Sequence, residues 1–330
     1  FFMTCKVAFI GLGVMGYPMA GYISKGGHKV TVFNRTKSKA EKWVSEYKGN
    51  IAETPAEAAK EAEYIFTCVG NDNDLREVSL GEKGLFKTAK KGVIDSICSE
   101  ISKIIANGHS VILIHGAGSF GHLLAKKWSL AAGVDDEISE QQRDAVVKVR
   151  SDMAELCGYV TDSLNSFGVE FAVFPPSVWA KETGRNFIGD LDIFENTPKD
   201  IVPVSFGDVV RVSGGAEFGI LSGDDLMARI SLEIPSVTHS IFLLGDVDGM
   251  MNLPPNTDGS RLMPVWSAEE HIETSHNSEQ DVTGGIELKA SRASQISRGV
   301  DEVWFINGNH PERISQLLDE GSTIGTKILG

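Results

Sequence analysis

The chain contains the same local arrangement twice: a short apolar run, a glycine-rich turn and then a helical pattern. The first copy is Lys6–Ile10 followed by Gly11-Leu12-Gly13-Val14-Met15-Gly16. The second is Val111–Ile114 followed by His115-Gly116-Ala117-Gly118-Ser119-Phe120-Gly121-His122. Turns of this kind cradle phosphate groups, because their small residues expose backbone N–H groups at a helix N-terminus. With 330 residues available, two such turns predict two α/β units.

Charge is distributed unevenly between these two regions. Residues 1–94 carry a net charge of +4 and residues 95–330 a net charge of −18, out of the total of −14. This contrast indicates two units of different origin, and we place the boundary at Ile94-Asp95. The acidic second unit argues against nucleic acid or an anionic membrane as a partner.

The cysteines and the apolar runs of the sequence predict which metal sites, disulfide bonds and cellular location to expect. The four cysteines are scattered without a Cys-x-x-Cys spacing, so we expect no structural zinc site, no other metal centre and no disulfide framework. The chain has no apolar run of about 20 residues and no signal-peptide pattern. We therefore expect a cytoplasmic protein, and the sequence leaves open whether it forms a homodimer.

The first glycine turn has the context of a dinucleotide-binding fingerprint. It lies between a strand and a helix, and a second strand, Val30–Phe33, follows at the right distance. Where NAD-binding proteins carry an acidic residue, this chain has Asn34-Arg35-Thr36, and an arginine there suits the 2′-phosphate of NADP. The alternative is that Arg35 is only a solvated loop residue. The candidate NADP-binding residues are Gly11, Gly13, Val14, Met15, Gly16, Asn34, Arg35 and Thr36.

These residues, together with Thr67-Cys68-Val69-Gly70-Asn71-Asp72, resemble the 3-hydroxyisobutyrate dehydrogenase (β-hydroxyacid dehydrogenase) family. The likeness ends near Val93-Ile94. Members of that family continue into a second glycine-rich substrate motif and a helical domain with a catalytic lysine, and neither is found after Ile94. Residues 1–94 are therefore expected to form a partial Rossmann unit.

The second region reads as an open α/β sheet with its site along one edge. Ile97, Ile101, Ile104 and Ile105 lie at helical spacing, and the glycine turn after Ile114 lacks the Gly-Lys-Ser/Thr ending of a Walker loop. Polar turns then follow apolar runs, as parallel strands delivering a site would have them. These segments are Val202–Asp208, Ile220–Asp225, Ile241–Gly249 and Val303–His310, with Asp281–Gly285 preceding a helix that carries Lys289.

In this order, the motifs resemble the isopentenyl phosphate kinase branch of the amino-acid-kinase family, over about residues 95–330. The resemblance implies ATP with Mg²⁺ as the phosphoryl donor, and a phosphate acceptor bound by the loop amides and by His122. It implies that Asp224 organises the site and that Lys289 contacts the nucleotide phosphates, so the implied catalytic residues are His122, Asp224 and Lys289. The implied acceptor-binding residues are Gly116, Ala117, Gly118, Ser119, Gly121 and His122. The implied nucleotide-binding residues are Gly223, Asp246, Val247, Asp248, Gly249, Thr283, Gly284, Gly285 and Lys289.

Several of these residues have a structural alternative. His122 could satisfy local backbone groups, Asp225 could be a helix-start residue, and Asp246 and Asp248 could be turn formers. We expect His115 to be structural and assign no role to His271 or His276. Aromatic side chains could line a pocket for an isoprenoid tail or belong to the core; these are Trp128, Phe171, Phe174 and Trp179.

The resemblance to the kinase family is incomplete at its N-terminal end. Members begin with a strand and a Lys-x-Gly-Gly-Ser turn, and no such segment precedes Ser96; Lys25-Gly26-Gly27-His28 is only an echo of it. A strand of the first unit could fill the gap, in which case the two sheets should merge. Three functions remain open: phosphorylation of isopentenyl phosphate, NADP-dependent oxidation or reduction of a small β-hydroxyacid, and an inactive fusion of two incomplete enzymes.

Overall fold

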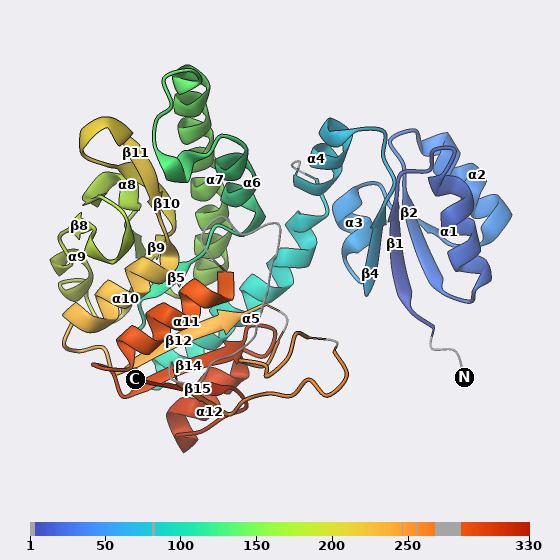
Figure 1. The fold of residues 1–330 in the computed structure, drawn as a ribbon. Coiled ribbons are helices and arrows are strands. Elements are labelled where there is room, and N and C mark those ends of the chain that lie inside the picture. Colours follow the sequence, from blue (N-terminus) through green and yellow to red (C-terminus); the bar gives the residue numbers. More distant parts are fainter. Residues whose placement is uncertain (1–3, 81–82, 246, 256, 268–284) are drawn as a thin grey trace. The chain divides into compact units, whose positions relative to one another are not determined.

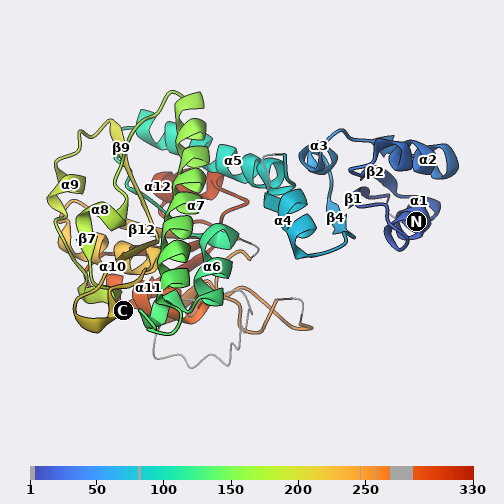
Figure 2. The same ribbon diagram turned by 90° about the horizontal axis from the view of Figure 1, so that it is seen from above.

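The computed structural model describes residues 4–80, 83–245, 247–255, 257–267 and 285–330 (Figures 1 and 2). Contacts divide the chain into two compact units, Phe1–Ile94 and Asp95–Gly330. Helix α5, Phe86–Ala106, runs through this division. The helix that we expected near Asp95 therefore begins earlier in the chain, at Phe86.

The first unit is a parallel sheet with helices on both faces. Its strand order is β3-β2-β1-β4, and β1 carries apolar side chains to both faces. Val7 and Phe9 pack in the cluster that contains Trp43, whereas Ala8 and Ile10 pack with Ala58. A strand covered on both faces reads as a continuous apolar run, as this one does. The elements are β1 (Lys6–Ile10), α1 (Gly16–Lys25), β2 (Lys29–Phe33), α2 (Lys37–Tyr47), β3 (Asn50–Ile51), α3 (Pro55–Ala59), β4 (Tyr64–Thr67) and α4 (Asp72–Leu80).

The second unit contains three sheets among its described residues. A parallel sheet has the order β5-β9-β6, a mixed sheet has the order β11-β10-β7-β8, and a second mixed sheet has the order β12-β14-β15-β13. The strands are β5 (Leu113–His115), β6 (Glu170–Val173), β7 (Ala180–Lys181), β8 (Ile188–Gly189), β9 (Ile201–Phe206), β10 (Asp208–Arg211), β11 (Phe218–Leu221), β12 (His239–Leu244), β13 (Val265–Ser267), β14 (Glu302–Asn307) and β15 (Thr326–Leu329). The helices are α6 (Gly118–Lys127), α7 (Ser139–Ser166), α8 (Pro176–Trp179), α9 (Asp192–Glu195), α10 (Gly223–Glu233), α11 (Gly285–Ile296) and α12 (Glu312–Glu320), with 3₁₀ turns η1 (Leu130–Ala132), η2 (Gly184–Asn186) and η3 (Gly214–Ala216).

Helices cover both faces of the sheet that contains β12 (Figure 1). On one face, Ala293 and Ile296 of α11 pack with Phe242 and Phe305. On the other face, a separate cluster joins α5 and α12 to this sheet through Ile104, Trp304, Ile306, Ile314 and Leu317. The isoleucine face expected from the sequence is thus buried at Ile101 and Ile104.

Helix α10 connects the sheets of the second unit. It lies against β5, β9 and β12, and β5 and β12 are each the terminal strand of their own sheet. The sequence therefore predicted the α/β class correctly. A sheet shared by the two units would need a strand pair that joins them. In the described part of the chain, the strands of each unit pair among themselves, and the merged-sheet hypothesis stays a prediction.

Two expected boundaries shift around the second glycine turn. The strand is Leu113–His115 rather than Val111–Ile114, and α6 already begins at Gly118. Most of the expected glycine loop is therefore the first turn of a helix, which directs its unpaired N–H groups toward the preceding residues. Within the described ranges, no helix combines the length and apolar character required to cross a membrane.

Candidate functional site

Three backbone segments of the second unit meet where β5 and β9 end and α10 begins. The N–H of Gly207 donates to the carbonyl oxygen of His115 at 3.2 Å. A Cβ on Gly223 would lie 3.6 Å from that same oxygen, and a Cβ on Gly207 would lie 3.3 Å from the nitrogen of Gly223. The close approach of these glycines brings the second glycine turn beside the N-terminus of α10.

The glycine turn itself is compact on one side and open on the other. Gly118 has φ +50°, and a Cβ on Gly121 would lie 3.0 Å from the Cβ of Ala117. In contrast, a Cβ on Gly116 would meet no atom of the described residues within 4 Å. His122 follows in the second turn of α6 and is half-buried; the side chain of Ser119 lies outside the described atoms. Open space at Gly116 next to a helix N-terminus fits an anionic phosphate group.

An ion pair joins α10 to α11 at this place. Lys289 Nζ donates to Asp224 Oδ1 at 2.5 Å, with the two side chains 28% and 15% exposed. Lys289 Nζ also lies 5.3 Å from the centre of the Phe242 ring on β12. The structure thus brings together Asp224 and Lys289, which the sequence separates widely, at the start of α10.

A second ion pair lies next to the first. Arg292 Nε donates to Asp225 Oδ1 at 2.7 Å, and Ser222 Oγ donates to Asp225 Oδ2 at 2.8 Å. Ser222 caps α10, because its hydroxyl accepts the N–H of Asp225. Asp225 is therefore a helix-start residue with a partner on α11. Sequence analysis missed Arg292, although its spacing of one helical turn from Lys289 places the two on one side of α11.

A separate network of hydrogen bonds holds the turn after β12. Asp248 Oδ1 accepts hydrogen bonds from Arg313 at 2.6 Å and from Asn307 at 3.1 Å. The Arg313 hydrogen bond holds the pKa of Asp248 below its ordinary value. Thr326 Oγ1 accepts the N–H of Met250, and a Cβ on Gly249 would lie 2.4 Å from that oxygen. Asp248 and Gly249 thus shape the turn, and Val247 packs against the core cluster beside α11.

Some expected nucleotide-binding residues fall outside this description. Asp246, Thr283 and Gly284 lie outside the described residues, as do His271 and His276, and Gly285 is the first residue of α11.

His115 and the aromatic residues have structural surroundings. The His115 ring stacks on Phe206 at 4.9 Å between ring centres, and its Nε2 atom is buried without a hydrogen-bond partner among the described residues. Burial lowers the pKa of His115 to about 4. Phe174 and Trp179 belong to the buried cluster that includes Phe194. These two side chains therefore contribute to the core, while Phe171 is 36% exposed and Trp128 half-buried.

Asp208 is a buried carboxylate that ends the expected segment Val202–Asp208, to which the sequence assigned no individual role. Its Oδ2 accepts the N–H of Ser177 at 2.9 Å, and its Oδ1 accepts the N–H of Val209. The Ser177 bond fastens α8 to the start of β10, directly after Gly207. The only signal in the sequence was its place directly after a strand and a glycine.

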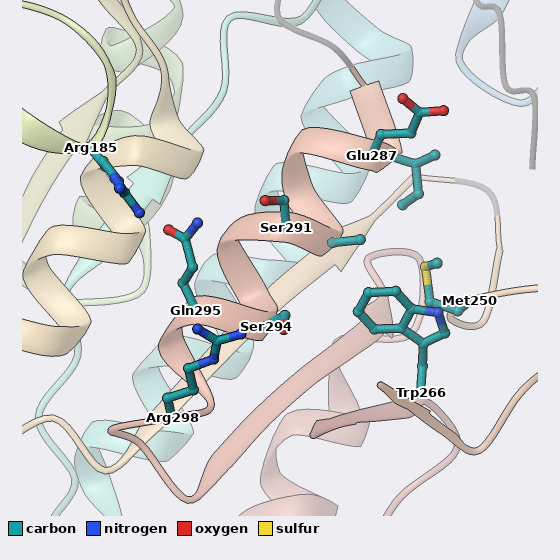
Figure 3. Close-up of a pocket in the computed structure, with 10 residues that line it drawn as sticks. Arg185, Met250, Trp266, Glu287, Ser291, Ser294, Gln295 and Arg298 are labelled. Carbon is teal, nitrogen blue, oxygen red and sulfur yellow. The ribbon is translucent and has the colours of Figure 1, made fainter. Parts of the chain in front are cut away.

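A pocket of about 410 Å³ runs along α11 (Figure 3). Its lining includes Ala290 and Ser294 of α11, and Arg298 just beyond the end of that helix. Trp266 and Met250 form an apolar wall, and Figure 3 shows Arg185 and Gln295 pointing toward one another across the space. Arg292 Nη1 donates to Oε1 of the lining residue Gln295 at 3.5 Å, so the pocket adjoins the Asp225–Arg292 ion pair.

The glycine turn of the first unit fits a dinucleotide. Gly11 has φ +96°, and a Cβ on it would lie 2.3 Å from the carbonyl oxygen of Cys68. A Cβ on Gly16 would lie 2.0 Å from the carbonyl oxygen of Gly11, whereas a Cβ on Gly13 would meet no atom within 4 Å. Gly11 and Gly16 thus make the tight turn, and Gly13 leaves space for a pyrophosphate, with Val14 and Met15 exposed beside it.

The residues after β2 have different roles. Asn34 Oδ1 accepts the N–H of Leu12 at 2.8 Å, so Asn34 holds the glycine turn in place. Arg35 is 88% exposed and lies 3.3 Å from Asp74. Thr36 precedes α2 and makes no capping hydrogen bond through its side chain. The Lys25-Gly26-Gly27-His28 segment forms the end of α1, where the N–H of Gly26 donates to the carbonyl oxygen of Tyr22.

Two family profiles match the chain. The NAD binding domain of 6-phosphogluconate dehydrogenase matches residues 6–110, and the Amino acid kinase family matches residues 78–307. The two matches overlap across α5, the helix through which the boundary between the units passes.

Individual proteins match the two regions separately. An isopentenyl phosphate kinase of Thermoplasma acidophilum is 33% identical over 254 residues, covering 75% of this chain and 95% of that relative. An X-ray structure of isopentenyl phosphate kinase superposes with a TM-score of 0.61 at 26% identity, covering 72% of this chain and 90% of the other. An uncharacterized oxidoreductase of Shewanella frigidimarina is 58% identical over 89 residues, and the chain spans only 31% of its length.

Proposed function

The chain belongs to the amino acid kinase family, and on that premise we propose that its second unit transfers the γ-phosphoryl group of ATP to isopentenyl phosphate. One observation carries the proposal. The Asp224–Lys289 ion pair holds an ammonium group at the N-terminus of α10, where the backbone of Gly223 meets those of His115 and Gly207. An ammonium group and the backbone N–H groups of a helix N-terminus are both suited to binding phosphate.

The chemistry of phosphoryl transfer explains why such an arrangement is sufficient. An oxygen of the acceptor phosphate attacks the γ-phosphorus of Mg·ATP in line, and ADP leaves, so one P–O bond forms as another breaks. The protein supplies charge and orientation rather than a covalent intermediate. We assign Lys289 to the charge on the transferring phosphoryl group and Asp224 to holding that lysine.

The acceptor is itself an anion, which adds a requirement. A second phosphate close to ATP must be held in place against repulsion between the two anions. We assign this role to the amides of the glycine turn, from Gly116 to Gly121, and to His122 on the next turn of α6. An imidazole can donate a hydrogen bond to the phosphate and, when protonated, offsets part of its charge.

A coupled assay of ADP release tests this assignment. With Mg·ATP and isopentenyl phosphate, we expect turnover in the unaltered chain and a loss of about 100-fold or more in kcat/KM for His122→Ala. His109→Ala is the matched control, because His109 is exposed and lies before β5, outside the assigned groups. Absence of turnover in a folded sample would refute the proposal and would leave the inactive-fusion hypothesis in its place. Turnover would mean that this chain acts without a Lys-x-Gly-Gly-Ser turn before Ser96.

For the first unit we propose NADP binding, as a second and separate function. The observation that favours it is the match between the glycine turn and a pyrophosphate site, with open space at Gly13 and an exposed Arg35 at the end of β2. Bound NADP supplies hydride-transfer chemistry, and in this chain Arg35 would face its 2′-phosphate. Titration with NADPH and NADH tests the assignment. We expect preference for NADPH, and equal affinities in the unaltered chain would contradict a role for Arg35.

A further inference from the structure

Helices α10 and α11 are joined by two ion pairs that lie side by side. Asp224 and Asp225 are consecutive residues in the first turn of α10, and Lys289 and Arg292 lie three residues apart on α11. Residues at that spacing face the same side of a helix. The pairs close at 2.5 Å for Asp224–Lys289 and at 2.7 Å for Asp225–Arg292. Any rotation of α11 about its axis would disturb both.

The Asp225–Arg292 pair is more buried than the Asp224–Lys289 pair. The side chains of Asp225 and Arg292 are 6% and 15% exposed. Both carboxylate oxygens of Asp225 are engaged, one by Arg292 and the other by Ser222, and the Ser222 hydroxyl accepts the Asp225 N–H in return. Asp225 is thereby tied to the cap of its own helix and to the neighbouring helix at once.

Each of these two helices contributes an alanine to the same core cluster. Ala228 of α10 and Ala293 of α11 are both buried in the same core cluster. Alanines let two helices approach closely, but their low ridges constrain rotation and sliding less than larger side chains do. The two ion pairs therefore add directional contacts between α10 and α11 to the packing of Ile296 on the sheet that contains β12.

We propose that Asp225 and Arg292 are positioning residues, which hold α11 in the rotation that keeps the ammonium group of Lys289 on Asp224. This inference rests on the proposed kinase function only for its effect on turnover. The guanidinium is suited to the task, because its planar N–H groups make a directional contact that a lysine cannot reproduce. Neither residue needs to touch a substrate.

The experiment compares four variants in the full chain: Asp225→Asn, Arg292→Lys, Arg292→Met, and the double variant Asp225→Asn with Arg292→Met. The steady-state constants kcat and KM for Mg·ATP and for isopentenyl phosphate are measured for each. A second readout is the rate at which an acetylating reagent modifies Lys289, followed by mass spectrometry with Lys148 as the internal reference. Glu233→Gln is the matched control, since it removes the exposed carboxylate that pairs with Arg229 on the same helix α10.

We expect kcat to fall about 10- to 100-fold in Asp225→Asn and Arg292→Met, because a misplacement of about 1 Å costs rates of that order. KM for isopentenyl phosphate should change less than about threefold. Arg292→Lys should recover part of kcat, and Lys289 should be acetylated several times faster in every variant with a lowered kcat. Glu233→Gln should match the unaltered chain in all of these readouts.

The outcomes separate the possible failures. If Asp225→Asn does not fold because Arg292 is left unpaired, the double variant removes both charges and decides the question. Unchanged kcat and unchanged Lys289 labelling in a folded variant would overturn the positioning role. If the unaltered chain shows no turnover, the kinase proposal fails, while the labelling rates still decide whether Asp225 and Arg292 position Lys289.

Discussion

Removal of the Lys289 ammonium group should affect stability and activity in different ways. Lys289→Met leaves the Asp224 carboxylate, 15% exposed, without its ion-pair partner. Breaking a fully buried pair costs about 3–5 kcal/mol and an exposed pair at most about 1 kcal/mol. With Lys289 28% exposed, we expect a loss between these limits, about 2 kcal/mol of unfolding free energy.

The double variant Asp224→Asn with Lys289→Met gives the diagnostic result. It removes the stranded charge as well, so its stability should return to within about 1 kcal/mol of the unaltered chain. Turnover should stay at least about 100-fold lower in both variants, because the ammonium group is absent from each. Stability is thus recovered while activity is not.

Urea unfolding followed by tryptophan fluorescence measures the stability effect. Trp266 and Trp304 are buried in the sheet that contains β12, on which α11 packs, and report on this region. At an m-value of about 3 kcal/mol/M, a loss of 2 kcal/mol lowers the midpoint by about 0.7 M. A coupling free energy below about 0.5 kcal/mol in the full cycle, or near-normal turnover in the double variant, would refute this reasoning.

Three further predictions follow from contacts in the structure. Asp74→Asn should tighten NADPH binding about two- to fivefold and leave NADH binding unchanged, because the carboxylate beside Arg35 opposes the 2′-phosphate; fluorescence titration measures both. Unfolding free energy should fall by up to about 3 kcal/mol between pH 6.5 and pH 4 through His115, and this part should vanish in His115→Gln. Cys98 and Cys157 are buried, and burial raises the pKa of both thiols, that of Cys157 to about 11, so a thiol reagent at pH 8 should modify them only after unfolding.

The sign of the pH effect follows from the direction of the shift. Burial holds the folded-state pKa of His115 at about 4, below its ordinary value of 6.5, so the unfolded chain binds more protons between these two values. Stability is therefore full above pH 6.5 and is lost as the pH falls toward 4. An equal pH dependence of stability in His115→Gln would contradict the assignment of this effect to His115. Rapid labelling of Cys157 in the native state would contradict the prediction that its thiol is protected.

Much of the fold could be predicted from the sequence, because it depends on local patterns of residues. β1 is found at Lys6–Ile10 as expected, since a strand buried on both faces must be continuously apolar. The glycine spacing in the first unit predicted a tight turn, and the positive φ of Gly11 is what that turn requires. The order of the motifs in the second unit predicted its family before any contact was known.

Tertiary structure decided the matters that depend on long-range contacts. Whether Asp224 or Asp225 meets Lys289 is set by the rotation of α10 against α11, which no spacing along the chain specifies. The partner of Arg292 also depends on this rotation, because the sequence shows Arg292 only as a helical residue. The order in which strands β1–β4 pair within their sheet is likewise decided by tertiary structure. Local sequence determines which residues can form a strand, a turn or a cap. Which partners they meet depends on packing between elements that are far apart in the chain.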